Sequence, residues 1–156
     1  MWKQPEPGGK SFGPADTKAL EAYLGRILSA GVWTRAEAVR KLVARGASRR
    51  DAEDLVKRFS ERGCFDDRSY ALLFVDTHSE WGMIRLRDEL RRRGVPQDCI
   101  DEAVLGVDEE SRAEALALGW RRLGMEAGGI LSRLLRRGFS PRVSRKVSER
   151  ACEPED

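Results

Sequence analysis

The fold is decided by one stretch of sequence, RLRDELRRRGVP at residues 85–96, because degenerate copies of it occur twice more in the chain. Sliding the sequence against itself aligns the copies on Gly46, Gly94 and Gly138, with spacings of 48 and 44 residues. Four residues before each glycine is a leucine: Leu42, Leu90 and Leu134. Such a period is typical of helical repeats, because one unit cannot bury its apolar face alone and neighbouring units stack to complete the core.

Each repeat is predicted to contain three helices, because each has two internal stop-and-start signals. The aligned glycine suits the left-handed position that ends a helix, and the Ser or Pro two residues later suits the start of the next helix. Thr34 and Glu37 have the spacing of a capping box, and Ser140-Pro141 places a cap before a proline at the first helical position. The expected helices run over 16–30, 34–45, 48–62, 66–79, 82–93, 96–105, 108–123, 126–137 and 140–150.

We therefore predict an all-α fold of three tandem three-helix repeats that form an elongated, curved rod. The repeats are expected at residues 16–62, 63–107 and 108–150. Residues 1–15 are rich in Pro and Gly and are interpreted as a flexible leader, and residues 151–156 are interpreted as an acidic tail.

The composition agrees with an open helical protein and excludes several classes. Of the 156 residues, 35% are charged and 40% are apolar, which is rather little apolar content for a compact single-core enzyme. No apolar run approaches the ~20 residues that a membrane span needs. Cys64, Cys99 and Cys152 are odd in number and lack C-x-x-C spacing, which indicates reduced thiols. We expect a cytoplasmic monomer without a membrane partner.

Three segments carry a resemblance to a known family. Residues 63–74, GCFDDRSYALLF, resemble the most recognisable motif of the RecX family: Gly, aromatic, aliphatic, Asp or Asn, Asp, two variable residues, aromatic, Ala. Residues 81–95, WGMIRLRDELRRRGV, resemble its second motif, and residues 131–139, LSRLLRRGF, resemble its Phe-Leu-x-Arg-Arg-Gly-Phe pattern. The resemblance extends over about residues 20–147. The positions that carry the motifs and the repeat are Gly63, Asp66, Asp67, Tyr70, Phe74, Gly82, Leu90, Gly94, Leu134 and Gly138.

The resemblance implies a regulatory function in DNA repair and recombination. Proteins of this family are modulators of RecA recombinase that lie in the groove of the RecA filament on single-stranded DNA. The resemblance thus implies inhibition of strand exchange, ATP turnover and coprotease activity, and a role in the SOS response. The alternative is a free-standing helical DNA-binding module that contacts phosphates. A recognition helix that mixes Asn, Gln and Arg on one face is absent from the sequence, which favours the regulatory interpretation.

Enzymatic chemistry is not expected, and no metal or cofactor is implied. His78 is the only histidine, and Asp76 and Glu80 do not face it on a helix; we interpret it as a solvent-facing residue at a helix end. No Walker, H-E-x-x-H or G-x-S-x-G motif occurs. Asp66 and Asp67 could be mistaken for a metal-binding carboxylate pair, but their place favours a helix cap.

Basic clusters are the candidate surface for contacts with RecA or with DNA inside the filament. Arginine supplies 23 of the 29 basic residues, and its planar guanidinium suits carboxylates and phosphates. An ordinary solvated helix face remains the alternative interpretation. The candidate residues lie at equivalent places in the second and third repeats: Arg85, Arg87, Arg91, Arg92, Arg93, Arg133, Arg136 and Arg137.

The repeat pattern generates a prediction about secondary structure in solution. The far-ultraviolet circular dichroism spectrum should be that of a helical protein with almost no strand, because β-branched alternation is missing from the whole chain. A spectrum with substantial β content would contradict the aligned glycines as helix ends.

Overall fold

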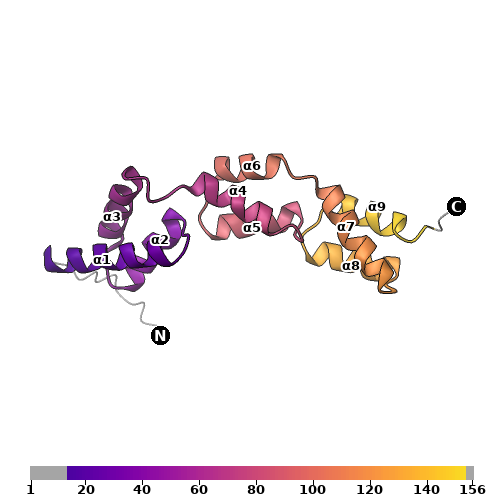
Figure 1. The fold of residues 1–156 in the computed structure, drawn as a ribbon, viewed down its shortest axis with the longest axis horizontal. Coiled ribbons are helices and arrows are strands. Elements are labelled where there is room, and N and C mark those ends of the chain that lie inside the picture. Colours follow the sequence, from indigo (N-terminus) through magenta and orange to yellow (C-terminus); the bar gives the residue numbers. More distant parts are fainter. Residues whose placement is uncertain (1–13, 154–156) are drawn as a thin grey trace, which may run out of the picture. The chain divides into compact units, whose positions relative to one another are not determined.

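The computed structural model describes residues 14–153, and in that range the chain forms nine α-helices and no strand (Figure 1). The helices are α1 (Pro14–Ala30), α2 (Arg35–Ala44), α3 (Arg49–Glu61), α4 (Asp67–Thr77), α5 (Met83–Arg92), α6 (Gln97–Leu105), α7 (Glu109–Arg122), α8 (Ala127–Arg136) and α9 (Pro141–Arg150). Each lies within two residues of an expected range. The prediction of an all-α fold is confirmed.

Both ends of the described region differ slightly from expectation. Helix α1 begins at Pro14 and not at Asp16, because proline suits the first turn of a helix, where its missing N–H is not needed. Residues 1–13 of the predicted leader and 154–156 of the predicted tail lie outside the described residues. Ala151 and Cys152 of that tail pack, half-buried, against the core of the last three helices.

The helix-ending role of the aligned glycines is confirmed by their backbone conformation. Gly46, Gly94 and Gly138 have φ angles of 105°, 76° and 81°, in the left-handed region that side chains with a Cβ rarely adopt. At the helix starts, Thr34 and Glu37 form the complete capping box. The Ser140 hydroxyl accepts a hydrogen bond from the Val143 N–H, directly before Pro141.

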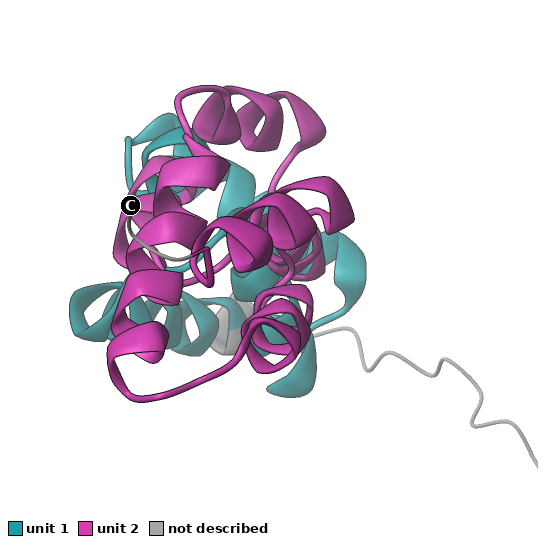
Figure 2. Ribbon diagram, turned by 90° about the vertical axis from the view of Figure 1, so that its right-hand side faces the viewer, with its two compact units in different colours: residues 1–70 teal, residues 71–156 magenta. Residues whose placement is uncertain are grey.

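The chain divides into two compact units with a boundary between Tyr70 and Ala71, within α4 (Figure 2). The division into repeats at 62/63 and 107/108 stays a prediction. The first unit holds α1 to α3 and the start of α4. Its core contains Leu24, Leu42 and Leu55, and Phe65 joins this core from the segment before α4.

A buried acid completes the first unit. The Asp67 carboxylate accepts a hydrogen bond of 3.2 Å from the Arg35 N–H, which is the first N–H of α2. The first four N–H groups of a helix have no partner within the helix, so Asp67 supplies one of them. Burial raises the pKa of Asp67, and the hydrogen bond from Arg35 opposes this rise. The start of α4 thus acts as a cap for α2.

In the second unit, the helix ends of α4 and α5 are bound by residues of the last repeat. The Gly82 N–H donates to the Arg137 carbonyl at 2.9 Å, and the Ile84 N–H donates to the Gly138 carbonyl at 3.0 Å. The Glu109 carboxylate of α7 accepts hydrogen bonds from the N–H groups of Met83 and Ser140, at 3.0 Å each. One carboxylate therefore caps α5 and also holds the start of α9.

The end of α4, at the same turn of this helix hairpin, is bound by a cation from the same turn of α7. The Arg112 guanidinium donates to the carbonyls of Val75 and His78, at 3.2 Å each, where α4 ends. An acid at a helix N-terminus and a base at a C-terminus both match the helix dipole. The first turn of α7 therefore fixes the third repeat on the second through backbone groups.

This joint generates a prediction about stability. Gly82 is buried, and a Cβ at this position would overlap the backbone of Gly138 and Phe139. The substitution Gly82→Ala should lower the free energy of unfolding by about 2 kcal/mol, in the range of other overpacked sites. Urea unfolding measures the effect. The control is Gly119→Ala in α7, where a Cβ meets nothing within 4 Å and should stabilise the helix by up to about 1 kcal/mol. If Gly82→Ala and Gly119→Ala had the same free energy of unfolding, the close backbone contact of Gly82 with Gly138 and Phe139 would be contradicted.

Candidate functional site

The arginine directly before each aligned glycine lies over an aromatic ring of the first helix in its own repeat. The guanidinium carbon is 4.5 Å from the ring centroid of Tyr23 for Arg45, 4.7 Å from that of Phe74 for Arg93, and 5.5 Å from that of Trp120 for Arg137. These are cation–π distances. We name these three pairs the clamp. It recurs in all three repeats, and it ties the end of each second helix to the first helix.

The clamp changes the interpretation of two candidate residues. Arg93 and Arg137 were predicted as partner contacts, and both are half-buried with their guanidinium groups on an aromatic ring of the chain itself. Arg93 also forms an ion pair of 2.6 Å with Glu89. Sequence alone could have suggested this role, because an aromatic residue lies 18 to 23 positions before each aligned glycine.

A second stack links α4 to α5. The His78 ring lies 4.1 Å from the Phe74 ring and 4.1 Å from the Trp81 ring, and the Arg85 guanidinium lies 4.2 Å from the Trp81 centroid. The expectation of a solvent-facing His78 is wrong, because its Nδ1 also lies 2.7 Å from the Phe74 carbonyl and the ring is half-buried. Arg85 is therefore engaged in the stack that holds the α4–α5 turn.

The remaining arginines of α5 form ion pairs with acids of the same repeat. Arg87 pairs with Asp101 at 2.6 Å, Arg91 with Asp88 at 3.2 Å, and Arg92 with Glu89 at 3.9 Å. The Arg93 hydrogen bond lowers the pKa of Glu89, and the Arg87 hydrogen bond lowers the pKa of Asp101. Both acids are thus held ionised, and the exposed face of α5 carries mixed charge.

The arginines of α8 differ from those of α5. Helix α8 contains no acidic residue, and neither Arg133 nor Arg136 has a carboxylate partner among residues 14–153. Both side chains are exposed. Arg133 lies 5.6 Å from the Trp120 centroid, and the Arg136 Nε donates to the Ser132 carbonyl at 3.4 Å. Equivalent positions in two repeats therefore present different electrostatic surfaces.

The acid pair at the start of α4 caps helix ends. The Asp66 carboxylate accepts hydrogen bonds from the Ser69 N–H at 3.0 Å and from the Ser69 hydroxyl at 2.6 Å, which lower the pKa of Asp66. Asp67 is directed to Arg35 instead. Within the described part of the chain, no three His, Cys, Asp or Glu side chains are grouped as metal ligands.

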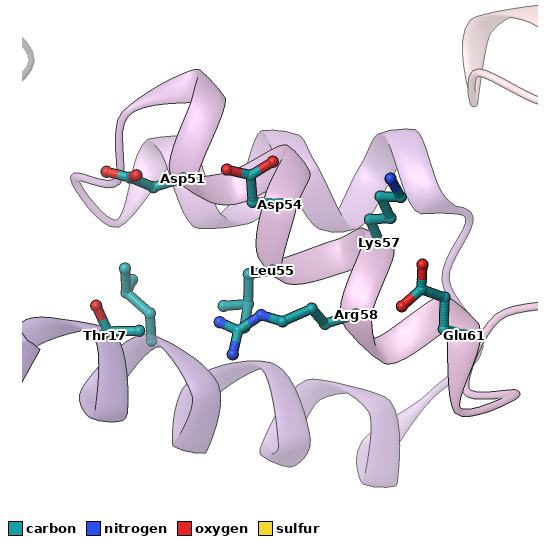
Figure 3. A pocket seen from close by; sticks show the side chains of 8 residues that line it. Thr17, Asp51, Asp54, Leu55, Lys57, Arg58 and Glu61 are labelled. Atoms are coloured by element: carbon teal, nitrogen blue, oxygen red, sulfur yellow. The ribbon is translucent and has the colours of Figure 1, made fainter.

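A groove of about 520 Å³ lies between α1 and α3. Figure 3 shows Leu55 and Arg58 of α3 directed toward α1. Arg58 forms an ion pair of 3.1 Å with Glu21 of α1. The acids Asp51, Asp54 and Glu61 also line the groove, together with Lys57. The groove is thus open to solvent and is lined by side chains of both charges from α1 and α3.

Among residues 14–153, no helix is long and apolar enough to cross a lipid bilayer.

Comparisons with known proteins agree with these elements. The family model for the second three-helix domain of RecX matches residues 66–104, from the Asp66 cap to α6. The regulatory protein RecX of Halorhodospira halophila is 31% identical to the chain, over 92% of the chain and 94% of that protein. The protein of the same name from Thermobifida fusca is 32% identical, over 96% of the chain and 88% of that protein. The chain belongs to the RecX family.

Solved RecX structures share the fold. The crystal structure of RecX from Lactobacillus salivarius superimposes with a TM-score of 0.74 at 19% identity, covering 88% of the chain and 97% of that protein. A second crystal structure of a regulatory protein RecX has a TM-score of 0.73 at 24% identity, covering 86% of the chain and 73% of that protein. The three-helix repeats predicted from the aligned glycines are therefore those of the RecX fold.

The clamp generates a prediction that uses neighbouring arginines as matched controls. Arg93→Ala and Arg137→Ala should each lower the free energy of unfolding by about 1 kcal/mol, because a partly desolvated cation–π contact is lost. Arg92→Ala and Arg136→Ala remove the same charge one residue earlier from exposed positions, and they should change stability by less than about 0.5 kcal/mol. Urea unfolding of the four variants distinguishes the positions. The clamp would be contradicted if Arg92→Ala lowered the free energy of unfolding as much as Arg93→Ala, and Arg136→Ala as much as Arg137→Ala.

Proposed function

We propose that the chain regulates a RecA-type recombinase by binding its filament on single-stranded DNA, and that it inhibits strand exchange, ATP turnover and coprotease activity without chemistry of its own. The observation that carries the proposal is the match to regulatory RecX proteins over almost the whole chain and almost the whole relative. This match includes all three repeats. The proposal therefore assigns the function to the three repeats together.

The repeats give a physical reason for a filament as the partner. A filament presents the same surface on successive subunits, and a chain of similar repeats can contact several copies of that surface. Linked contacts raise the apparent affinity, because the second contact forms within a complex that already exists. Binding across neighbouring subunits would hold them in one arrangement. This accounts for an effect on ATP turnover and strand exchange together.

The mixed charge of α5 suits a contact with protein in this proposal. Arg91 and Arg92 are exposed, and their acidic partners Asp88 and Glu89 lie on the same helix. Interspersed charges of both signs give electrostatic complementarity to a particular protein surface and fix its register. The residues that contact the recombinase remain a proposal, with Arg87, Arg91 and Arg92 as the candidates on α5.

Co-sedimentation with RecA filaments tests the function. The chain should pellet with RecA assembled on single-stranded DNA in the presence of ATP, and it should lower the rate of ATP hydrolysis. The double variant Arg91→Glu, Arg92→Glu should bind about 3- to 30-fold more weakly, because each exposed contact contributes ~0.2–1 kcal/mol and reversal adds repulsion.

The matched control for this test is Lys18→Glu, Lys57→Glu, which reverses two exposed cations of α1 and α3. It should bind like the unchanged chain if α5 makes the contact. Circular dichroism of each variant must show unchanged helicity. A chain that stays in the supernatant and leaves ATP turnover unaltered at molar excess would contradict the proposed function.

A further inference from the structure

The helix pair α8–α9 carries an unbalanced charge that its counterpart in the second repeat lacks. From residue 127 to residue 150 the sequence contains seven Lys or Arg and a single acid, Glu149. The equivalent pair α5–α6, from residue 83 to residue 105, contains five Lys or Arg and five Asp or Glu. The two pairs have the same fold and differ by six in net charge, +6 against 0. Packing does not require this difference.

Only part of this charge is balanced by the rest of the chain. Lys146 and Arg150 form ion pairs with Glu110 of α7, at 2.6 and 3.1 Å, and Lys146 lowers the pKa of Glu110. Arg137 is held in the clamp. Four exposed arginines have no carboxylate within 4.0 Å in the region from residue 14 to residue 153: Arg133, Arg136, Arg142 and Arg145.

These four arginines lie close together along the chain. They flank the turn that joins α8 to α9, at Gly138 and Ser140, and the two helices pack directly against each other. The turn itself is fixed, because its carbonyl groups cap α5 and its serine is bound by Glu109. The guanidinium groups are thus displayed from a rigid support, which reduces the entropy lost when they bind a ligand.

The chemistry of the surrounding surface favours phosphate over protein. Protein interfaces are anchored by buried apolar and aromatic side chains, whereas nucleic-acid interfaces are more polar and strongly positive. On α8 and α9 the only large apolar side chain that is exposed is Leu135, at 44%. The pair also contains no Asn or Gln, so the side chains that read adenine are missing from it.

We propose that the α8–α9 pair, through Arg133, Arg136, Arg142 and Arg145, binds the sugar–phosphate backbone of single-stranded DNA without reading its sequence. The inference rests on the proposed function in one respect, because it assigns the DNA contact within the filament to the third repeat. The binding itself does not need the recombinase. Arginines that already pair with carboxylates, as on α5, would first have to give up those contacts, and so contribute less.

The test measures binding of the full chain to a fluorescent oligo-dT of about 30 nucleotides by anisotropy, at salt concentrations from about 50 to 200 mM. The triple variant Arg136→Ala, Arg142→Ala, Arg145→Ala should bind about tenfold more weakly at the lowest salt. The slope of log K against log salt should decrease by about 2, because each phosphate contact on a single strand contributes about 0.7.

The matched control is Arg87→Ala, Arg91→Ala, Arg92→Ala on α5, which removes the same net charge from paired positions. It should bind within about threefold of the unchanged chain and keep the salt slope. The variant Arg136→Lys, Arg142→Lys, Arg145→Lys should retain binding within about threefold, because phosphate contacts depend mainly on charge. This lysine variant also keeps the proposal testable if the α8–α9 alanine variant loses helicity.

Three outcomes would overturn the inference. The first is that the unchanged chain does not bind oligo-dT at the lowest salt, and the second is that the α5 and α8–α9 alanine variants lose the same oligo-dT affinity. The third is an α8–α9 variant that keeps its oligo-dT binding and no longer binds RecA filaments. The last result would assign this face to an acidic protein surface. Oligo-dT binding that depends on α8–α9, together with no effect on RecA, would support this inference and contradict the proposed function. The two failures are therefore distinguishable.

Discussion

The capping of helix ends by neighbouring segments is the constraint on which the rest of this structure depends. The helices are short, between nine and 17 residues, and every helix leaves four N–H and four carbonyl groups without partners inside it. Asp67 binds the first N–H of α2, Glu109 binds the start of α5, and Arg112 binds the end of α4. Unsatisfied backbone groups are costly when they are buried, so these contacts fix the start of α2 and the two helix ends that meet at the α4–α5 turn.

The same constraint explains why so many charged residues in a basic protein are structural. Arginines in the clamp, in the His78 stack and in the Arg112 cap are engaged by aromatic rings or carbonyls of the chain itself. Their positive charge does not indicate a partner. Helices α8 and α9 depart from this use, because residues 127–150 carry seven Lys or Arg and a single acid. The repeats therefore share a fold while their surfaces differ.

Much of the fold could be predicted from residues, and the failures have physical causes. The aligned glycines, the Thr34–Glu37 capping box and the Ser140-Pro141 start act over a few residues, so local sequence predicts each helix within two positions. His78 was misjudged because its i,i+4 neighbour Phe74 was not considered, and because Trp81 meets its ring only after the chain turns between α4 and α5. The candidate arginines stay a prediction as partner contacts, and their ion pairs differ because α5 contains Asp88 and Glu89 whereas α8 contains no acid.

The sequence by itself determined the helices, their repetition and the membership of the RecX family, because these depend on periodicity, capping and short motifs along the chain. Tertiary structure alone decided which residues of other helices the arginines meet. Arg87 of α5 has Asp101 of α6 at 2.6 Å, and Arg137 after α8 lies 5.5 Å from the Trp120 centroid of α7. Coulomb interactions and ring contacts depend on distance in space, and distance in space is set by packing.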